Sequence, residues 1–177
     1  MMKKKIIVLG LLIGCLLMTG CGKEQGKITG NYTNDDLSKM VDTIYKEVGE
    51  DNLPKTSITE VDINDLDSLK YYTGLTSNKD IDSVVASEAM IISQAYSFVL
   101  VKVKNDADIT SVKQDIYDNI DTRKWICVEA EALYINNYDT VIAVVMTSKE
   151  WAFPLYDAFA KLYKDNLGTK LAKEMEI

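Results

Sequence analysis

Two successive units of strand, strand and helix in the second half of the chain constrain its fold most strongly. From Val84 onward, short runs of β-branched and aromatic residues are separated by polar pairs, which is typical of strands joined by tight turns. Four strands are predicted, with turns near residues 93–94 and 136–137, and their ranges are 84–92, 96–104, 127–136 and 139–146. A helical stripe of apolar residues follows each pair of strands, and Pro154 is expected in the first turn of the second helix.

The two units also resemble each other in sequence. An offset of 43 residues places Glu88 opposite Glu131 and Val112 opposite Leu155. Identities are few, so a common architecture without a common origin stays open. Residues 96–104 are apolar on both alternating faces, which favours a central strand. We expect an α+β fold, a two-layer sandwich whose four-stranded, mainly antiparallel sheet has helices covering one face.

Helical patterns precede these units. An apolar stripe between residues 37 and 48 begins after a capping-box pair, Thr33 and Asp36, and ends at Gly49. A shorter helix is expected from residue 62 or 63 to about 72, with Gly74 as its terminator. A last helical turn is expected after Gly168. These helices and the two units form a single domain over residues 34–177.

The N-terminus has the three parts of a secretory signal. Three lysines precede an apolar run over residues 6–18, and small residues close it. The run is shorter than the roughly 20 apolar residues that a membrane-spanning helix needs. Residues 1–20 are therefore interpreted as a signal peptide and residues 21–33, which are mostly polar, as a flexible tether.

Met18-Thr19-Gly20-Cys21 resembles the lipobox of bacterial lipoproteins. The resemblance implies a diacylglycerol on the Cys21 sulfur and cleavage after Gly20, which would hold the chain on the outer face of the cell membrane. An alternative lipobox ending at Cys15 would leave a shorter apolar core, and cleavage before Cys21 is favoured for that reason.

Composition excludes several functions. Without the three lysines of the leader, 17 basic residues face 27 acidic ones, a net charge of −10, which argues against nucleic acid as a partner. The chain has no histidine, so the commonest general base and zinc ligand are missing. Cys127 follows Trp125 and Ile126 in an apolar run and is interpreted as a buried packing residue. We expect no cofactor, no metal and no enzymatic activity.

Three glutamates are the weak candidates for a polar site. Glu129 and Glu131 are two residues apart on a predicted strand and so would share a face, where paired carboxylates could transfer protons or hold a cation. Glu88 lies among apolar residues, and Lys102, Arg123 or Lys124 could pair with it. A structural role is favoured for all three.

Several segments in this order are similar to a family of envelope lipoproteins of Gram-positive bacteria, the domain of unknown function four-three-five-eight. They are the helix over residues 37–48 with Leu53-Pro54 after it, residues 87–91, 99–103 and 123–130, and residues 138–146 leading to Phe159. The resemblance covers most of the mature chain and implies no activity, cofactor or catalytic residue.

The leading hypothesis is a membrane-anchored, non-enzymatic binding or interaction module whose protein or small-molecule partner is unknown. One alternative is the solute-capture lipoprotein of a transporter. Another is an envelope enzyme that depends on carboxylates or a metal.

Overall fold

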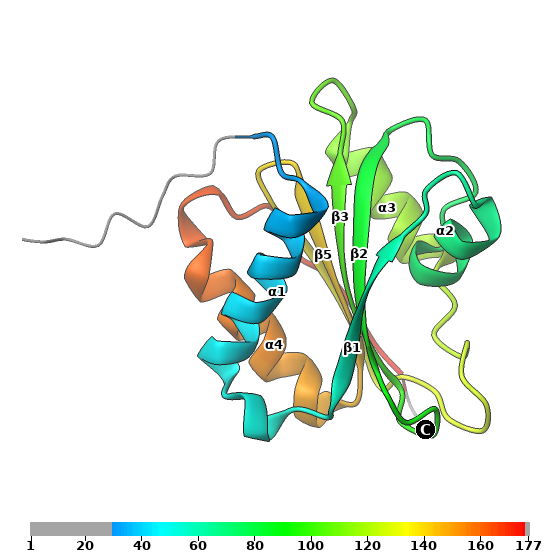
Figure 1. The fold of residues 1–177 in the computed structure, drawn as a ribbon, viewed down its shortest axis with the longest axis vertical. Helices are drawn as coiled ribbons and strands as arrows, with labels where there is room; N and C mark the ends of the chain where they lie inside the picture. The colour runs from blue at the N-terminus through cyan, green and yellow to red at the C-terminus, as the bar shows by residue number, and fades with distance from the viewer. Residues whose placement is uncertain (1–29, 176–177) are drawn as a thin grey trace, which may run out of the picture.

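A computed structural model describes residues 30–175, which form one sheet with helices packed against it (Figure 1). The elements in chain order are α1 (Asn34–Val48), the 3-10 turn η1 (Glu50–Asn52), β1 (Thr56–Val61), α2 (Leu66–Thr73), β2 (Ile81–Ala89), β3 (Tyr96–Val103), α3 (Ile109–Asn119), β4 (Ala132–Tyr138), β5 (Val141–Thr147), α4 (Lys149–Leu162), the 3-10 turn η2 (Lys164–Asn166) and β6 (Leu171–Glu174). The expected α+β class is therefore confirmed.

The sheet has six strands instead of the four expected from the sequence. Their order is β1-β2-β3-β5-β4-β6, and every neighbouring pair is antiparallel. The two additional strands, β1 and β6, lie at the two edges. The central position predicted for residues 96–104 is confirmed, because every residue of β3 is buried and the strand pairs with β2 and β5.

Helices cover both faces of the sheet, so the expected two-layer arrangement is wrong and the domain has three layers. On one face, α1 and α4 pack over Phe98, Leu100 and Val145. On the other face, α2 and α3 pack over Val99 and Val101, which alternate with the first set along β3. A central strand that is apolar on both sides needs a cover on both sides, and a second helical layer provides it.

The two strand-strand-helix units are not copies of one arrangement. Val101 and Val144, which correspond under the 43-residue offset, lie on the same face of the sheet. The corresponding helix residues Val112 and Leu155 lie in the cores on opposite faces. No single rotation can superpose two units that send their helices to opposite faces, so their likeness is limited to the order of elements and the two hairpins.

Several predicted boundaries differ from the structure. β4 begins at Ala132 instead of residue 127, and the turn before β5 is at Asp139 and Thr140, since Tyr138 pairs with Val141. Asp139 adopts a positive φ of 51°, which a tight turn requires and which Asp tolerates. The segment after Gly168, expected as a helical turn, forms strand β6.

The helix signals were partly correct. Thr33 and Asp36 form the predicted capping box, with the Thr33 amide donating to the Asp36 carboxylate at 2.9 Å. Gly74 ends α2 in the left-handed region at φ 78°. The start predicted for the last helix is wrong, because α4 begins at Lys149 and Pro154 lies inside it.

The domain has two distinct ends. The turn between β2 and β3, the loop between α3 and β4 and the first turn of α4 meet at one end, where the Thr147 hydroxyl donates to the Ala95 carbonyl at 2.8 Å. We call it the hairpin end. The chain enters at the opposite end, about 25 Å away along the eight residues of β3, and there Asn34 bonds Glu60 at the far end of β1 from the hairpin. Within residues 30–175, no helix is long and apolar enough to span a bilayer.

Candidate functional site

The loop of residues 120–131 between α3 and β4 is fixed to the sheet by a buried lysine. The side chain of Lys124 is 3% exposed, and its ammonium group lies 2.5 Å from a carboxylate oxygen of Glu88 on β2. It also donates to the hydroxyl of Ser97, which pairs with Glu88 across the hairpin, at 3.2 Å. One loop residue therefore connects to both strands of the β2–β3 hairpin where they approach their turn.

Aromatic rings complete the surroundings of Lys124. Its ammonium nitrogen lies 4.3 Å from the ring centre of Tyr71, 5.1 Å from that of Tyr72 and 5.3 Å from that of Trp125. Burial lowers the pKa of Lys124 below its usual value, and the charge of Glu88 partly opposes this change. The carboxylate and the ring faces therefore replace the water that this ammonium group has lost.

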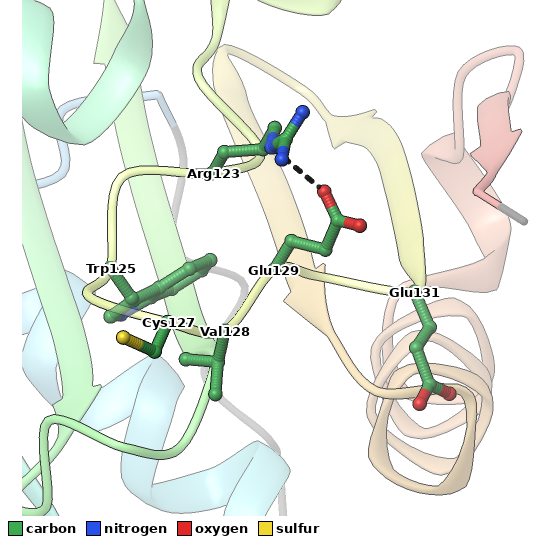
Figure 2. A pocket seen from close by; sticks show the side chains of 6 residues that line it. All are labelled: Arg123, Trp125, Cys127, Val128, Glu129 and Glu131. Carbon is green, nitrogen blue, oxygen red and sulfur yellow. Dashed lines mark ion pairs between the residues drawn. The ribbon is translucent and has the colours of Figure 1, made fainter. Parts of the chain in front are cut away.

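A surface cavity of about 530 Å³ lies along the same loop (Figure 2). Its lining residues are Arg123, Trp125, Cys127, Val128, Glu129 and Glu131. The Nε atom of Arg123 lies 3.0 Å from a carboxylate oxygen of Glu129, and this ion pair is shown by the dashed line in Figure 2. The carboxylate of Glu131 points away from that pair.

The structure does not bring the three candidate glutamates together. Glu88 pairs with Lys124 and Glu129 with Arg123, whereas Glu131 accepts a hydrogen bond from the backbone amide of Lys149 at 3.0 Å. Glu129 and Glu131 were expected on one strand, but both precede β4. Each carboxylate has its own partner, and that of Glu131 accepts from an amide in the first turn of α4 that has no partner within the helix.

Cys127 is exposed, which contradicts the interpretation of a buried packing residue. Its backbone has a φ of 64°, so the chain turns sharply at this residue and does not extend as a strand. Residues 125–128 are apolar but lie in a loop that pairs with no strand, so their composition alone does not bury Cys127. The other two predicted site residues, Gly20 and Cys21, lie outside the described residues.

The hairpin end also carries a group of exposed apolar side chains that the sequence interpretation missed. The exposed fractions are 67% for Met90, 56% for Ile91 and 71% for Ile92 in the β2–β3 turn, and 71% for Ile126 in the α3–β4 loop. The bonds from Lys124 to Glu88 and Ser97 hold the loop that carries Ile126 against the base of this hairpin. We call these four residues the apolar tip.

The chemistry of this end is suited to contact with another molecule. Each of the three glutamates is engaged in an ion pair or a backbone hydrogen bond, so none is arranged as an acid and base pair facing another. In the part of the chain that the structure describes, no group of His, Cys, Asp and Glu side chains could hold a metal ion. The apolar tip, in contrast, exposes large side chains of the kind that protein interfaces bury.

Comparisons with protein-family models, with curated proteins and with solved structures found no significant match for this chain.

Proposed function

We propose that the mature chain is a membrane-anchored extracytoplasmic module that binds a protein partner and catalyses no reaction. In this proposal the lipid on Cys21 holds the protein at the membrane, and the spacer ends before Tyr32, since Tyr32 is buried in the core and Thr33 caps α1. The observation that carries the binding role is the apolar tip, four large aliphatic side chains that are more than half exposed at one end of the sheet. Exposed apolar groups that gather in one place mark interaction sites more often than scattered ones do.

The placement of the tip supports the same role. The described chain enters at the end opposite the hairpin, and Cys21 precedes Gly30 by nine residues. Nine extended residues span at most about 30 Å, so the attachment point lies within about 30 Å of the entry end of the domain. When the tether is extended, this attachment leaves the hairpin end free to contact partners in the envelope.

The rigidity of the tip supports binding as well. In the turn with Met90, Ile91 and Ile92, the Met90 amide donates to the Lys55 carbonyl at 2.9 Å and the Gln94 amide to the Ile91 carbonyl at 3.0 Å, and the loop with Ile126 is fixed by Lys124. A surface that is already ordered loses little conformational entropy when it binds, which favours affinity.

The two alternatives have less support. Solute-capture lipoproteins usually have a cleft between two lobes, whereas residues 30–175 form one sheet with helices on both faces. An enzyme that uses Glu88, Glu129 and Glu131 would need at least two of them at one site, and they have separate partners. Membership of the lipoprotein family named above remains a prediction.

Crosslinking of the tagged protein in living cells tests the proposal. The wild-type chain and the Cys21→Ser variant would be treated with a membrane-impermeant crosslinker, and the captured proteins identified by mass spectrometry. We expect labelling by radioactive palmitate and one enriched protein with the wild type only. A wild-type protein that takes up palmitate but captures no protein would contradict the binding role.

A further inference from the structure

The surface beside the apolar tip has a pronounced negative charge. Glu50 and Asp51 in η1 and Glu150 in the first turn of α4 are exposed, and within residues 30–175 none of them forms an ion pair. We call these three residues the acidic rim. Lys55, between η1 and β1, is exposed too, but its one positive charge does not balance the three carboxylates. The acidic rim therefore keeps a net negative charge.

A groove connects the acidic rim to the hairpin. It has a volume of about 570 Å³ and is lined by Asp51, Leu53, Gln94, Glu150, Trp151 and Pro154, among others. Gln94 belongs to the β2–β3 turn that carries Met90, Ile91 and Ile92. The groove therefore reaches the turn that carries three residues of the apolar tip, and two carboxylates without an ion pair, those of Asp51 and Glu150, line it.

Trp151 gives this groove an aromatic wall that is fixed in position. Its ring meets the buried ring of Tyr96 edge to face, with centres 5.9 Å apart. An aromatic face beside carboxylates attracts an organic cation, because the ring and the carboxylates both stabilise positive charge. A lysine or arginine side chain of a partner fits this chemistry, with its aliphatic stem against Leu53 and Pro154.

We propose that the partner contacts the hairpin end with a segment that combines apolar side chains with lysine or arginine. The apolar side chains cover the apolar tip, and the cations lie in the groove along the acidic rim. This inference rests on the proposed function and adds the chemistry of the partner. Complementary charge sets the orientation and accelerates the encounter, while the apolar contact supplies most of the affinity.

The acidic rim argues against two other occupants of the same surface. Lipid headgroups with a negative charge would be repelled by Glu50, Asp51 and Glu150 as the apolar tip approached a bilayer. A second copy of this chain would bring its own acidic rim to the contact, because a twofold interface places the same patch on both subunits. A basic segment of a different protein meets neither obstacle.

The test uses the mature chain, residues 21–177 with Cys21→Ser, and three fluorescent peptides of 14 residues that combine leucine with lysine, glutamine or glutamate. Fluorescence anisotropy measures binding at physiological salt. We expect the leucine–lysine peptide to bind at least tenfold more tightly than the glutamine peptide and the glutamate peptide not to bind. Ile91→Asp and the double variant Asp51→Lys with Glu150→Lys should each weaken binding of the lysine peptide at least tenfold.

The matched control reverses two charges elsewhere, in Asp106→Lys with Asp115→Lys, both of which are exposed and lie outside the groove. If this control weakens binding as much as the rim variant, the attraction is only that of the net charge and the inference is wrong. Equal binding of all three peptides would also overturn it, as would sedimentation of the protein with phosphatidylglycerol vesicles or a concentration-dependent dimer that Ile91→Asp abolishes. Each variant must keep the thermal unfolding temperature of the parent.

These results can be separated from a failure of the proposed function. A partner captured in cells that does not depend on the acidic rim would refute the partner chemistry and leave the module intact. Capture of no protein would refute the module itself.

Discussion

Replacement of Glu88 by glutamine tests how the α3–β4 loop is held. Glu88→Gln keeps the shape of the side chain and removes the charge that faces Lys124, whose own side chain is 3% exposed. Loss of one partner from a buried ion pair costs about 3–5 kcal/mol of folding stability, because the other charge stays without compensation. Glu88 keeps a fifth of its side chain exposed, so water reaches this site and we expect the lower end, about 3 kcal/mol.

Urea unfolding measures this loss. A domain of this size has a slope of about 2 kcal/mol per molar urea, so the midpoint should fall by about 1.5 M. The comparison is Lys124→Met, which removes the buried charge and keeps the apolar stem. The Glu88 carboxylate that it leaves unpaired is a fifth exposed and reaches water, so we expect a smaller cost, about 1 kcal/mol. The double variant should be about as stable as Lys124→Met alone. A midpoint shift below about 0.5 M for Glu88→Gln, or a double variant less stable than both single variants, would refute this account.

The effect of pH has a definite sign. Burial lowers the pKa of Lys124 in the folded state below 10.5, and loss of Glu88 removes a charge that raises it. Between its folded pKa and 10.5 the unfolded chain binds more protons at this residue, so stability rises with pH in that window. The deficit of Glu88→Gln should therefore shrink as the pH rises toward 10.5. A deficit that grows over this range would mean that Lys124 is not the group left unpaired.

Three further predictions concern the fold and the loop. Gly74→Ala should cost about 2–3 kcal/mol in urea unfolding, because the residue has φ 78° and a Cβ would lie 2.5 Å from the Ile120 amide nitrogen. Gly30 has φ 70° but open space around it, so Gly30→Ala should cost about 1 kcal/mol. Equal costs would contradict the steric argument. Burial raises the pKa of Tyr163 to about 12, so folding stability should fall as pH rises from 10 to 12, and Tyr163→Phe should reduce that loss; an unchanged alkaline loss would contradict this. In a chain with Cys15→Ser and Cys21→Ser, the exposed Cys127 should react with a disulfide reagent in the folded state as fast as in urea, and protection by folding would mean that it is buried.

The central strands were predictable because strands that are buried on both faces consist almost entirely of apolar residues. Residues 96–103 and 141–147 are almost entirely apolar, and each of them is buried in the structure. The edge strands were missed because only one side of each is in contact with the domain. β1 exposes four of its six residues and β6 three of its four, so their sequences resemble loops.

The layer arrangement could not be deduced from the same pattern. An apolar stripe predicts that a helix packs on the sheet, and it does not say which face. The stripe with Val112 and the stripe with Leu155 look alike in the sequence and pack on opposite faces. The choice depends on how each connection leaves its strand, which is a property of the assembled fold.

The candidate site was predictable only in part. Lys124 was one of three bases considered for Glu88, and the structure selects it because the loop crosses the hairpin at that residue. The apolar tip was missed because Met90, Ile91 and Ile92 extend an apolar run that belongs to β2. Strand pairing stops at Ala89, and the sequence has no signal for the point at which pairing stops.

Photo-crosslinking from single positions in the lipidated protein is the most direct test of the proposed module. A photoreactive amino acid would replace Ile91 at the apolar tip or Asp106 at the opposite end, in cells that process and anchor the chain. We predict one crosslinked protein from position 91, none from position 106, and loss of the product when Cys21→Ser removes the anchor. Equal capture from both positions, or none from position 91 in an anchored and folded protein, would contradict the account.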